Sequence, residues 1–449
     1  MNRYSYIPHT AEDRQKMMAY LGIPDTEALF RDIPESVRMR RPLQLPAAMS
    51  ELALERHLQQ LSRKNLDFSQ VTSFLGAGAY EHYVPSVVDA IVGRSEFYTS
   101  YTPYQPEISQ GMLQAIFEYQ TMVAELTGMD IANASMYDGP TALAEAGLVC
   151  CVHTRRNKLL VAANLHPEYR AVLETYAAGQ AVEVAEIPLR GGSVNPEALR
   201  QLCDSTVAGV LVQYPNFFGC VEDLQALADI AHSAGALLVV AAYPIALGWL
   251  AAPGERGADI VVAEGQSLGN AVAYGGPYLG IMAANKDLMR RLPGRIVGQT
   301  TDAQGRRGFV LTLQAREQHI RREKATSNIC TNQALNALAA TVYLAYMGPA
   351  GLREVALQNH HKARYLQERL CALPGVERVF PEPYFNEFVL RLPRPVAQVQ
   401  QKLLEQGFLF GFDLGQAFPD LEGCVLLTVT EVRTREEMDA VVSALEGCL

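Results

Sequence analysis

A tyrosine-rich segment is the part of this sequence whose residue types best suit the recognition of a small polar ligand. Residues 98–110 read YTSYTPYQPEISQ, and their prolines stiffen the chain. A rigid loop of this kind presents hydroxyl, amide and carboxylate groups to a small molecule or to a partner protein. A purely structural loop fits the same composition. The candidate side chains of this segment are Tyr101, Tyr104, Gln105 and Glu107.

A second candidate is a phosphate-binding turn at residues 135–141, which read SMYDGPT and precede an Ala/Leu-rich helix. Backbone amides at a helix N-terminus bind phosphate well. Asp138 weakens this interpretation because its charge repels an anion, and Asp138 also suits the plain role of a helix N-cap. Both interpretations stay open. The candidate residues of this degenerate cup are Ser135, Asp138, Gly139, Thr141 and, further along the chain, Asn216.

The elements that must position these residues form an alternating pattern of strands and helices. Short apolar runs alternate with amphipathic helices, which predicts a mostly parallel sheet covered on both faces. The predicted strands lie at 159–163, 182–187, 210–212, 237–241, 260–263 and 278–283, and the predicted helices at 109–127, 139–152, 167–178, 195–202 and 224–233. We therefore predict an α/β chain with an N-terminal arm at 1–65, a large domain at 66–328 and a small α+β domain at 329–449.

This layout is that of many pyridoxal-phosphate enzymes, whose proteins supply a phosphate cup, a carboxylate beside the ring nitrogen and a lysine amine that bonds the cofactor. The carboxylate is expected after the strand near residue 240, where the chain has Ala241 and Ala242 instead. No lysine occurs between Asp259 and Gly280, and Gln266 is the nearest substitute. An amide cannot replace an amine in that bond. We therefore expect no catalytic residue for this chemistry in the chain.

Long motifs of the chain resemble glycine decarboxylase, the P-protein of the glycine cleavage system. They are YTPYQPEISQG at 101–111, FEYQTM at 117–122, NASMYDG at 133–139, QYPNFFG at 213–219 and SNICTNQAL at 327–335. The resemblance covers essentially the whole chain and is to the N-terminal half of that family, also called subunit 1 or the α subunit. It places Gln266 near the lysine position of the other half, and Ala241 or Ala242 near its aspartate.

The resemblance implies a fold-type I pyridoxal-phosphate transferase-like fold and a role in the oxidative decarboxylation of glycine. It implies that pyridoxal phosphate is bound covalently by a lysine-bearing subunit 2 (β), in an α2β2 heterotetramer, and that the aminomethyl group passes to the lipoamide arm of H-protein. This chain alone is then expected to be inactive. Side chains expected to reach the shared site are Tyr101, Tyr104, Gln105, Glu107 and Thr331.

Composition excludes several other classes of function. The chain has 38 basic and 48 acidic residues, and its net charge of −10 argues against nucleic acid as a main partner. No apolar run is long enough to span a membrane. The eight cysteines form no CxxC pair, so we expect reduced thiols and no metal site. The N-terminus lacks the pattern of a signal peptide, and we expect a cytoplasmic protein.

Three other functions stay open at this point. The chain could be an autonomous pyridoxal-phosphate enzyme that uses an unrecognised lysine. It could be a purely structural scaffold subunit that gives no side chain to an active site. It could also be a homodimeric binding protein unrelated to glycine.

Overall fold

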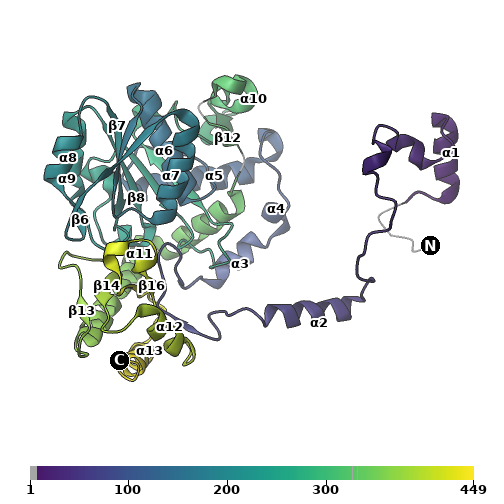
Figure 1. Ribbon diagram of the computed structural model, residues 1–449. Coiled ribbons are helices and arrows are strands. Elements are labelled where there is room, and N and C mark those ends of the chain that lie inside the picture. The colour runs from purple at the N-terminus through teal and green to yellow at the C-terminus, as the bar shows by residue number, and fades with distance from the viewer. Residues whose placement is uncertain (1–7, 326, 331) are drawn as a thin grey trace. The chain divides into compact units, whose positions relative to one another are not determined.

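The structure is a computed structural model that describes residues 8–325, 327–330 and 332–449. The chain divides into two compact units, Met1–Leu66 and Asp67–Leu449, shown in Figure 1. The predicted arm at residues 1–65 stays a prediction. The predicted boundary between a large and a small domain at residues 328 and 329 stays a prediction.

The described residues of the N-terminal unit form two helices and two short 3₁₀ turns. They are α1 (Ala11–Leu21), η1 (Thr26–Phe30), η2 (Glu35–Val37) and α2 (Glu51–Ser62). Ser50 is the N-cap of α2, and its hydroxyl accepts a hydrogen bond from the amide of Ala53 at 3.3 Å. Within the described part of this unit no residue is buried.

The second unit contains a seven-stranded sheet with the order β2-β10-β9-β8-β7-β3-β4. Five neighbouring strands, from β4 to β9 in that order, run parallel. Strand β10 runs antiparallel to β9 and to β2, so the sheet is mostly but not entirely parallel, as predicted. The cause is the connection after β9, which turns the chain straight back at residues 265–279. The strands are β2 (Ile131–Ala132), β3 (Lys158–Ala162), β4 (Glu183–Ile187), β7 (Val207–Tyr214), β8 (Leu237–Ala242), β9 (Ile260–Glu264) and β10 (Gly280–Ala284).

Helices cover both faces of this sheet, as the continuous apolar strands require. Alternate residues of a strand point to opposite faces, so Val240 joins the core beneath α5, α9 and α11, whereas Val239 joins the core beneath α6 and α7. Both cores are almost entirely aliphatic. The helices of the second unit that precede α11 are α3 (Ser86–Val92), α4 (Ser95–Tyr98), α5 (Gln110–Thr127), α6 (Gly139–Thr154), α7 (Pro167–Gln180), α8 (Pro196–Leu202), α9 (Leu224–Ser233) and α10 (Gln318–Arg321).

The C-terminal part begins with the long helix α11 (Ala334–Cys371), which is bent at Gly348, where φ is 60°. The sequence predicts two helices separated at this glycine. A four-stranded sheet follows, and a capping box at Thr434 starts the last helix. The first strand of the second unit, β1 (Thr72–Ser73), also belongs to this C-terminal part, because it pairs with β15 (Phe408–Leu409). The other elements are β13 (Glu377–Arg378), β14 (Glu387–Arg391), α12 (Val396–Leu404), β16 (Phe412–Asp413), β17 (Cys424–Thr428) and α13 (Arg435–Glu446).

Two hairpins were not predicted from the sequence, a short one of β5 (Leu189–Arg190) with β6 (Ser193–Val194) and a longer one of β11 (Ile296–Thr301) with β12 (Arg307–Thr312). The longer hairpin is tied to α5, because the side-chain amide of Gln110 donates to the carbonyl of Phe309 and accepts from its amide, both at 2.8 Å. This contact fixes the hairpin beside the tyrosine-rich loop. Among the described helices, none is long and apolar enough to cross a membrane.

Candidate functional site

Ala241, Ala242 and Gln266, the residues expected near lost cofactor ligands, meet in one small pocket. The two alanines end β8, and Gln266 comes two residues after β9. We call this cavity the β8–β9 pocket. Its volume is about 30 Å³, room for little more than a water molecule. It is lined by Gly78, Tyr80, His166, Tyr169, Gln213, Ala241, Ala242, Tyr243, Glu264, Gln266 and Ser267.

Gln266 is fully engaged in holding backbone together. Its side-chain oxygen accepts from the amide of Tyr80 at 2.9 Å, and its nitrogen donates to the Tyr80 carbonyl at 3.0 Å and to the Asn270 carbonyl at 2.7 Å. The residue is only 1% exposed. This position uses both a donor and an acceptor, which an amide supplies, whereas an ammonium group supplies donors and no acceptor. Its correspondence to the lysine of a homologous half stays a prediction.

Glu264, which sequence reasoning missed, occupies the anion-binding end of helix α6. One carboxylate oxygen accepts from the amide of Gly139 at 3.0 Å, and the other from the amides of Gln266 at 3.1 Å and Leu279 at 3.0 Å. Burial raises the pKa of Glu264 to about 7, although these amide bonds oppose the shift. An acidic residue at the end of the apolar run IVVA is the signal that could have revealed it.

The predicted phosphate cup is therefore closed by the chain's own acids. Asp138 is the N-cap of α6, and its carboxylate accepts from the amide of Thr141 at 2.8 Å. An outer pocket of about 470 Å³ opens over this helix end. Its lining, all within the described residues, contains the carboxylates of Asp138, Glu168 and Glu264 and no lysine or arginine. These residues do not fit pyridoxal phosphate, because the phosphate would meet acids instead of free amides and cations.

The remaining cup candidates lie elsewhere. Ser135 donates to the side-chain oxygen of Asn332 and lines a different cavity, described next. Asn216 is completely buried and shapes its own turn, since its oxygen accepts from the amides of Phe218 at 3.0 Å and Cys220 at 3.1 Å. The structure thus brings Asp138, Gly139 and Thr141 together and leaves Asn216 in a turn.

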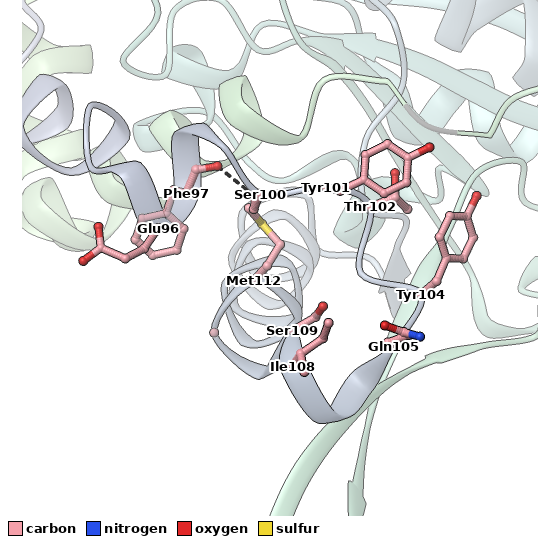
Figure 2. A pocket seen from close by; sticks show the side chains of 11 residues that line it. Glu96, Phe97, Ser100, Tyr101, Thr102, Tyr104, Gln105, Ile108, Ser109 and Met112 are labelled. Atoms are coloured by element: carbon pink, nitrogen blue, oxygen red, sulfur yellow. Dashed lines mark hydrogen bonds between the residues drawn. The ribbon is translucent and has the colours of Figure 1, made fainter. Parts of the chain in front are cut away.

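The tyrosine-rich loop borders two adjoining cavities, of about 730 and 250 Å³. We call the second the loop pocket. Figure 2 shows the first, with Tyr101 and Tyr104 beside one another; their ring centroids are 6.4 Å apart. Tyr101 is 84% and Tyr104 is 45% exposed in the single chain. The loop pocket is lined by Ser100, Tyr101, Thr102, Pro103, Met112, Ile116, Ala134, Ser135, Arg295, Cys330, Asn332, Ala334 and Leu335.

The other loop candidates have different surroundings. Gln105 lines the larger cavity, whereas Glu107 is exposed and lies outside the lining of either cavity. Thr331 lies outside the described residues.

Arg295, just before β11, is a second residue that sequence reasoning missed. Its Nη2 donates to the Tyr104 hydroxyl at 2.7 Å and to the Cys330 sulfur at 2.9 Å, and its guanidinium carbon lies 4.5 Å from the centroid of the Tyr104 ring. Hydrogen bonds to Tyr104 and to Cys330 both raise the pKa of Arg295, against the effect of burial. In the sequence, Arg295 is a single arginine within PGRIVG at 293–298, and nothing in that stretch indicates that it contacts the tyrosine-rich loop.

Comparisons with known proteins agree with this architecture. A solved crystal structure of glycine decarboxylase (P-protein) of the glycine cleavage system, in inhibitor-bound form, superposes with a TM-score of 0.91; it is 46% identical and covers 99% of this chain and 100% of that one. The glutamate decarboxylase of Lactobacillus brevis superposes with a TM-score of 0.69 at 13% identity, over 92% of this chain and 96% of that one. The chain therefore has the fold of the fold-type I pyridoxal-phosphate enzymes, as predicted.

Sequence comparison identifies one family within the fold-type I pyridoxal-phosphate enzymes. The family model described as glycine cleavage system P-protein matches residues 4–445. A relative from Moorella thermoacetica, named probable glycine dehydrogenase (decarboxylating) subunit 1, is 59% identical over 445 residues, which are 99% of this chain and 100% of the relative. The chain belongs to the glycine cleavage system P-protein family.

Proposed function

We propose that this chain is the subunit of a two-subunit glycine dehydrogenase (decarboxylating) that does not carry the cofactor. The full-length likeness to a protein named subunit 1 supports this assignment. The observation that carries it is the closed β8–β9 pocket, where Glu264 accepts a hydrogen bond from the Gly139 amide at the start of α6, and the side chain of Gln266, two residues after β9, donates to the Tyr80 carbonyl. A chain that has filled its own cofactor site needs a homologous partner that has kept one.

In the proposed complex, pyridoxal phosphate is bound by a lysine of subunit 2, and when bound there it supplies the electron sink for the decarboxylation of glycine. The aminomethyl group that remains is passed to the lipoamide arm of H-protein. The assembly is an α2β2 heterotetramer in the cytoplasm.

This chain contributes one wall of the shared site. Tyr101 and Tyr104 are exposed in the single chain on a loop whose base is fixed by Gln110 and Arg295. Their hydroxyls, with Gln105, Glu107 and Thr331, orient the substrate and exclude water. Their contribution is positioning, which lowers the barrier by holding groups in a reactive geometry.

The test is co-expression of this chain with the lysine-bearing subunit, followed by assay of glycine–bicarbonate exchange with lipoylated H-protein. Tyr101→Phe, Tyr104→Phe and Glu107→Gln are each expected to lower exchange about tenfold, the effect of about 1.4 kcal/mol on the barrier. Tyr346→Phe is the matched control, because Tyr346 is exposed on α11, outside both loop cavities.

Borohydride reduction followed by mass spectrometry locates the cofactor, which is expected on the other subunit. Cofactor on a lysine of this chain would favour the autonomous enzyme instead. Exchange that is unchanged in all three loop variants would leave this chain as a scaffold.

A further inference from the structure

Arg295 is a buried cation whose hydrogen-bonding capacity is only partly used. The residue is 5% exposed. Only Nη2 donates to neighbours, namely Tyr104 and Cys330. Nε and Nη1, which carry three of the five guanidinium N–H groups, have no acceptor among the described residues. Buried polar groups of folded proteins nearly always have partners, so these open donors need an explanation.

The nearest acid does not supply that partner. Glu317 lies 3.7 Å from Nη2 of Arg295, too far for a good hydrogen bond, and the same Glu317 oxygen has no hydrogen-bond partner among the described residues. Arg316, the residue before Glu317, is a second cation whose charge interacts with this acid. Its guanidinium donates to the carbonyls of Leu292 and Gly294. One carboxylate therefore stands beside two guanidinium groups, and the local charge is positive.

The cavity beside Arg295 suits an anionic group. Its lining, all within the described residues, contains one positive side chain and no carboxylate. Ser135 and Asn332 add further polar atoms. The guanidinium carbon lies over the ring of Tyr104, and an oxyanion binds a guanidinium group at its edges, where the N–H bonds point. At about 250 Å³ the cavity is large enough for a small amino acid or a phosphate group.

We infer that Arg295 binds the oxyanion of a ligand, a carboxylate or a phosphate, that enters the loop pocket from the second subunit. This inference rests on the proposed function, because the rest of the ligand is held by that subunit. Two sources have this chemistry in the proposed complex: the carboxylate of glycine and the phosphate of the cofactor. In either case the arrival of the anion satisfies the open N–H groups of Arg295.

The experiment compares complexes of the second subunit with the wild-type chain, Arg295→Gln, Arg295→Lys and the exposed control Arg321→Gln. Three quantities are measured: the dissociation constant of pyridoxal phosphate for the cofactor-stripped complex, the KM for glycine, and the rise in unfolding temperature caused by inorganic phosphate relative to chloride at equal ionic strength.

We expect Arg295→Gln to raise one of the two constants about tenfold or more, as loss of charge-assisted hydrogen bonds does. A raised cofactor constant identifies the phosphate as the ligand group, and a raised KM identifies the carboxylate. Arg295→Lys keeps the charge without the planar fork and is expected to recover part of the loss; it also decides the matter if Arg295→Gln does not fold. Both constants within about twofold of the wild-type values would overturn the inference.

The phosphate measurement separates this inference from the proposed function. A wild-type complex without glycine exchange would contradict the proposed function. A rise in unfolding temperature with inorganic phosphate that Arg295→Gln abolishes would still support an oxyanion site at Arg295, whereas an equal rise in both proteins would contradict it.

Discussion

The β8–β9 pocket and the loop pocket lie in the same chain and treat charge in opposite ways. In the first, the carboxylate of Glu264 accepts hydrogen bonds from three backbone amides. The side-chain amide of Gln266 there both donates and accepts. In the second, the guanidinium of Arg295 keeps three N–H groups without an acceptor among the described residues. The β8–β9 pocket thus contains a carboxylate of the chain itself, whereas the described lining of the loop pocket contains none.

The difference teaches how a retired site can be told from an incomplete one. In a pocket that no longer binds its ligand, the chain's own side chains must form hydrogen bonds with the polar groups that the ligand once bound. Otherwise those buried groups would stay unpaired and lower the stability of the fold. A pocket that is completed by a partner can leave them open in the single chain. Hydrogen-bond satisfaction, more than cavity volume, separates the two cases here.

The largest expected effect tests how firmly the β8–β9 pocket is closed. Gln266→Ala removes three hydrogen bonds and takes these partners from the buried backbone groups of Tyr80 and from the partly buried carbonyl of Asn270. We expect the free energy of unfolding to fall by about 3 to 4 kcal/mol, measured by urea denaturation of the chain. Gln358→Ala, which removes one solvent-exposed side-chain hydrogen bond on α11, is the control and should change it by less than about 0.5 kcal/mol. Equal stability of the two variants would show that the pocket is not held by Gln266.

The next effect concerns the internal anion. The pKa of Glu264 is raised by burial from 4.5 to about 7, so the folded chain binds this proton more tightly than the unfolded chain. Its stabilising contribution is therefore complete below pH 4.5 and is lost as pH rises through 7. Between pH 5 and 7 the wild-type chain should lose about 2 kcal/mol more stability than Glu264→Gln, which cannot titrate.

Urea unfolding at pH 5, 6 and 7 measures this difference. The comparison with Glu264→Gln is needed because Glu145, whose pKa burial also raises to about 7, contributes a similar slope to both proteins. Parallel pH profiles of wild type and variant would mean that Glu264 does not titrate in this range.

The fold was largely predictable because its signals are local. The helix at 224–233 and the capping box at Thr434 follow from periodicity and from short-range hydrogen bonding. Strand direction is not local: the antiparallel course of β10 depends on how the chain turns after β9, which the apolar run at 278–283 does not encode.

The site was predictable only where residues adjoin in sequence. The loop with Tyr101 and Tyr104 stands out by composition, and the absence of lysine near Gln266 is visible once the sheet is assumed. Glu264 and Arg295 carry the electrostatics of the two pockets, yet each acts on groups more than a hundred residues away, such as Gly139 and Tyr104. Contacts of that kind have no signature in a single sequence.

The smallest expected effect tests the comparison of the two pockets most directly. We expect that restoring the lysine and the acid does not restore binding of pyridoxal phosphate, although the identity of these residues alone would predict that it does. Gln266→Lys combined with Ala241→Asp, or with Ala242→Asp, returns the lysine and the acid that this fold uses elsewhere. The pocket at these positions still measures about 30 Å³, and the amides of α6 still face Glu264 and Asp138. Titration of either double variant with pyridoxal phosphate should therefore give no absorbance change and no lysine trapped by borohydride. Stoichiometric trapping at residue 266 would show that the internal acids are readily displaced, and that the two pockets differ in two residues rather than in how their charges are satisfied.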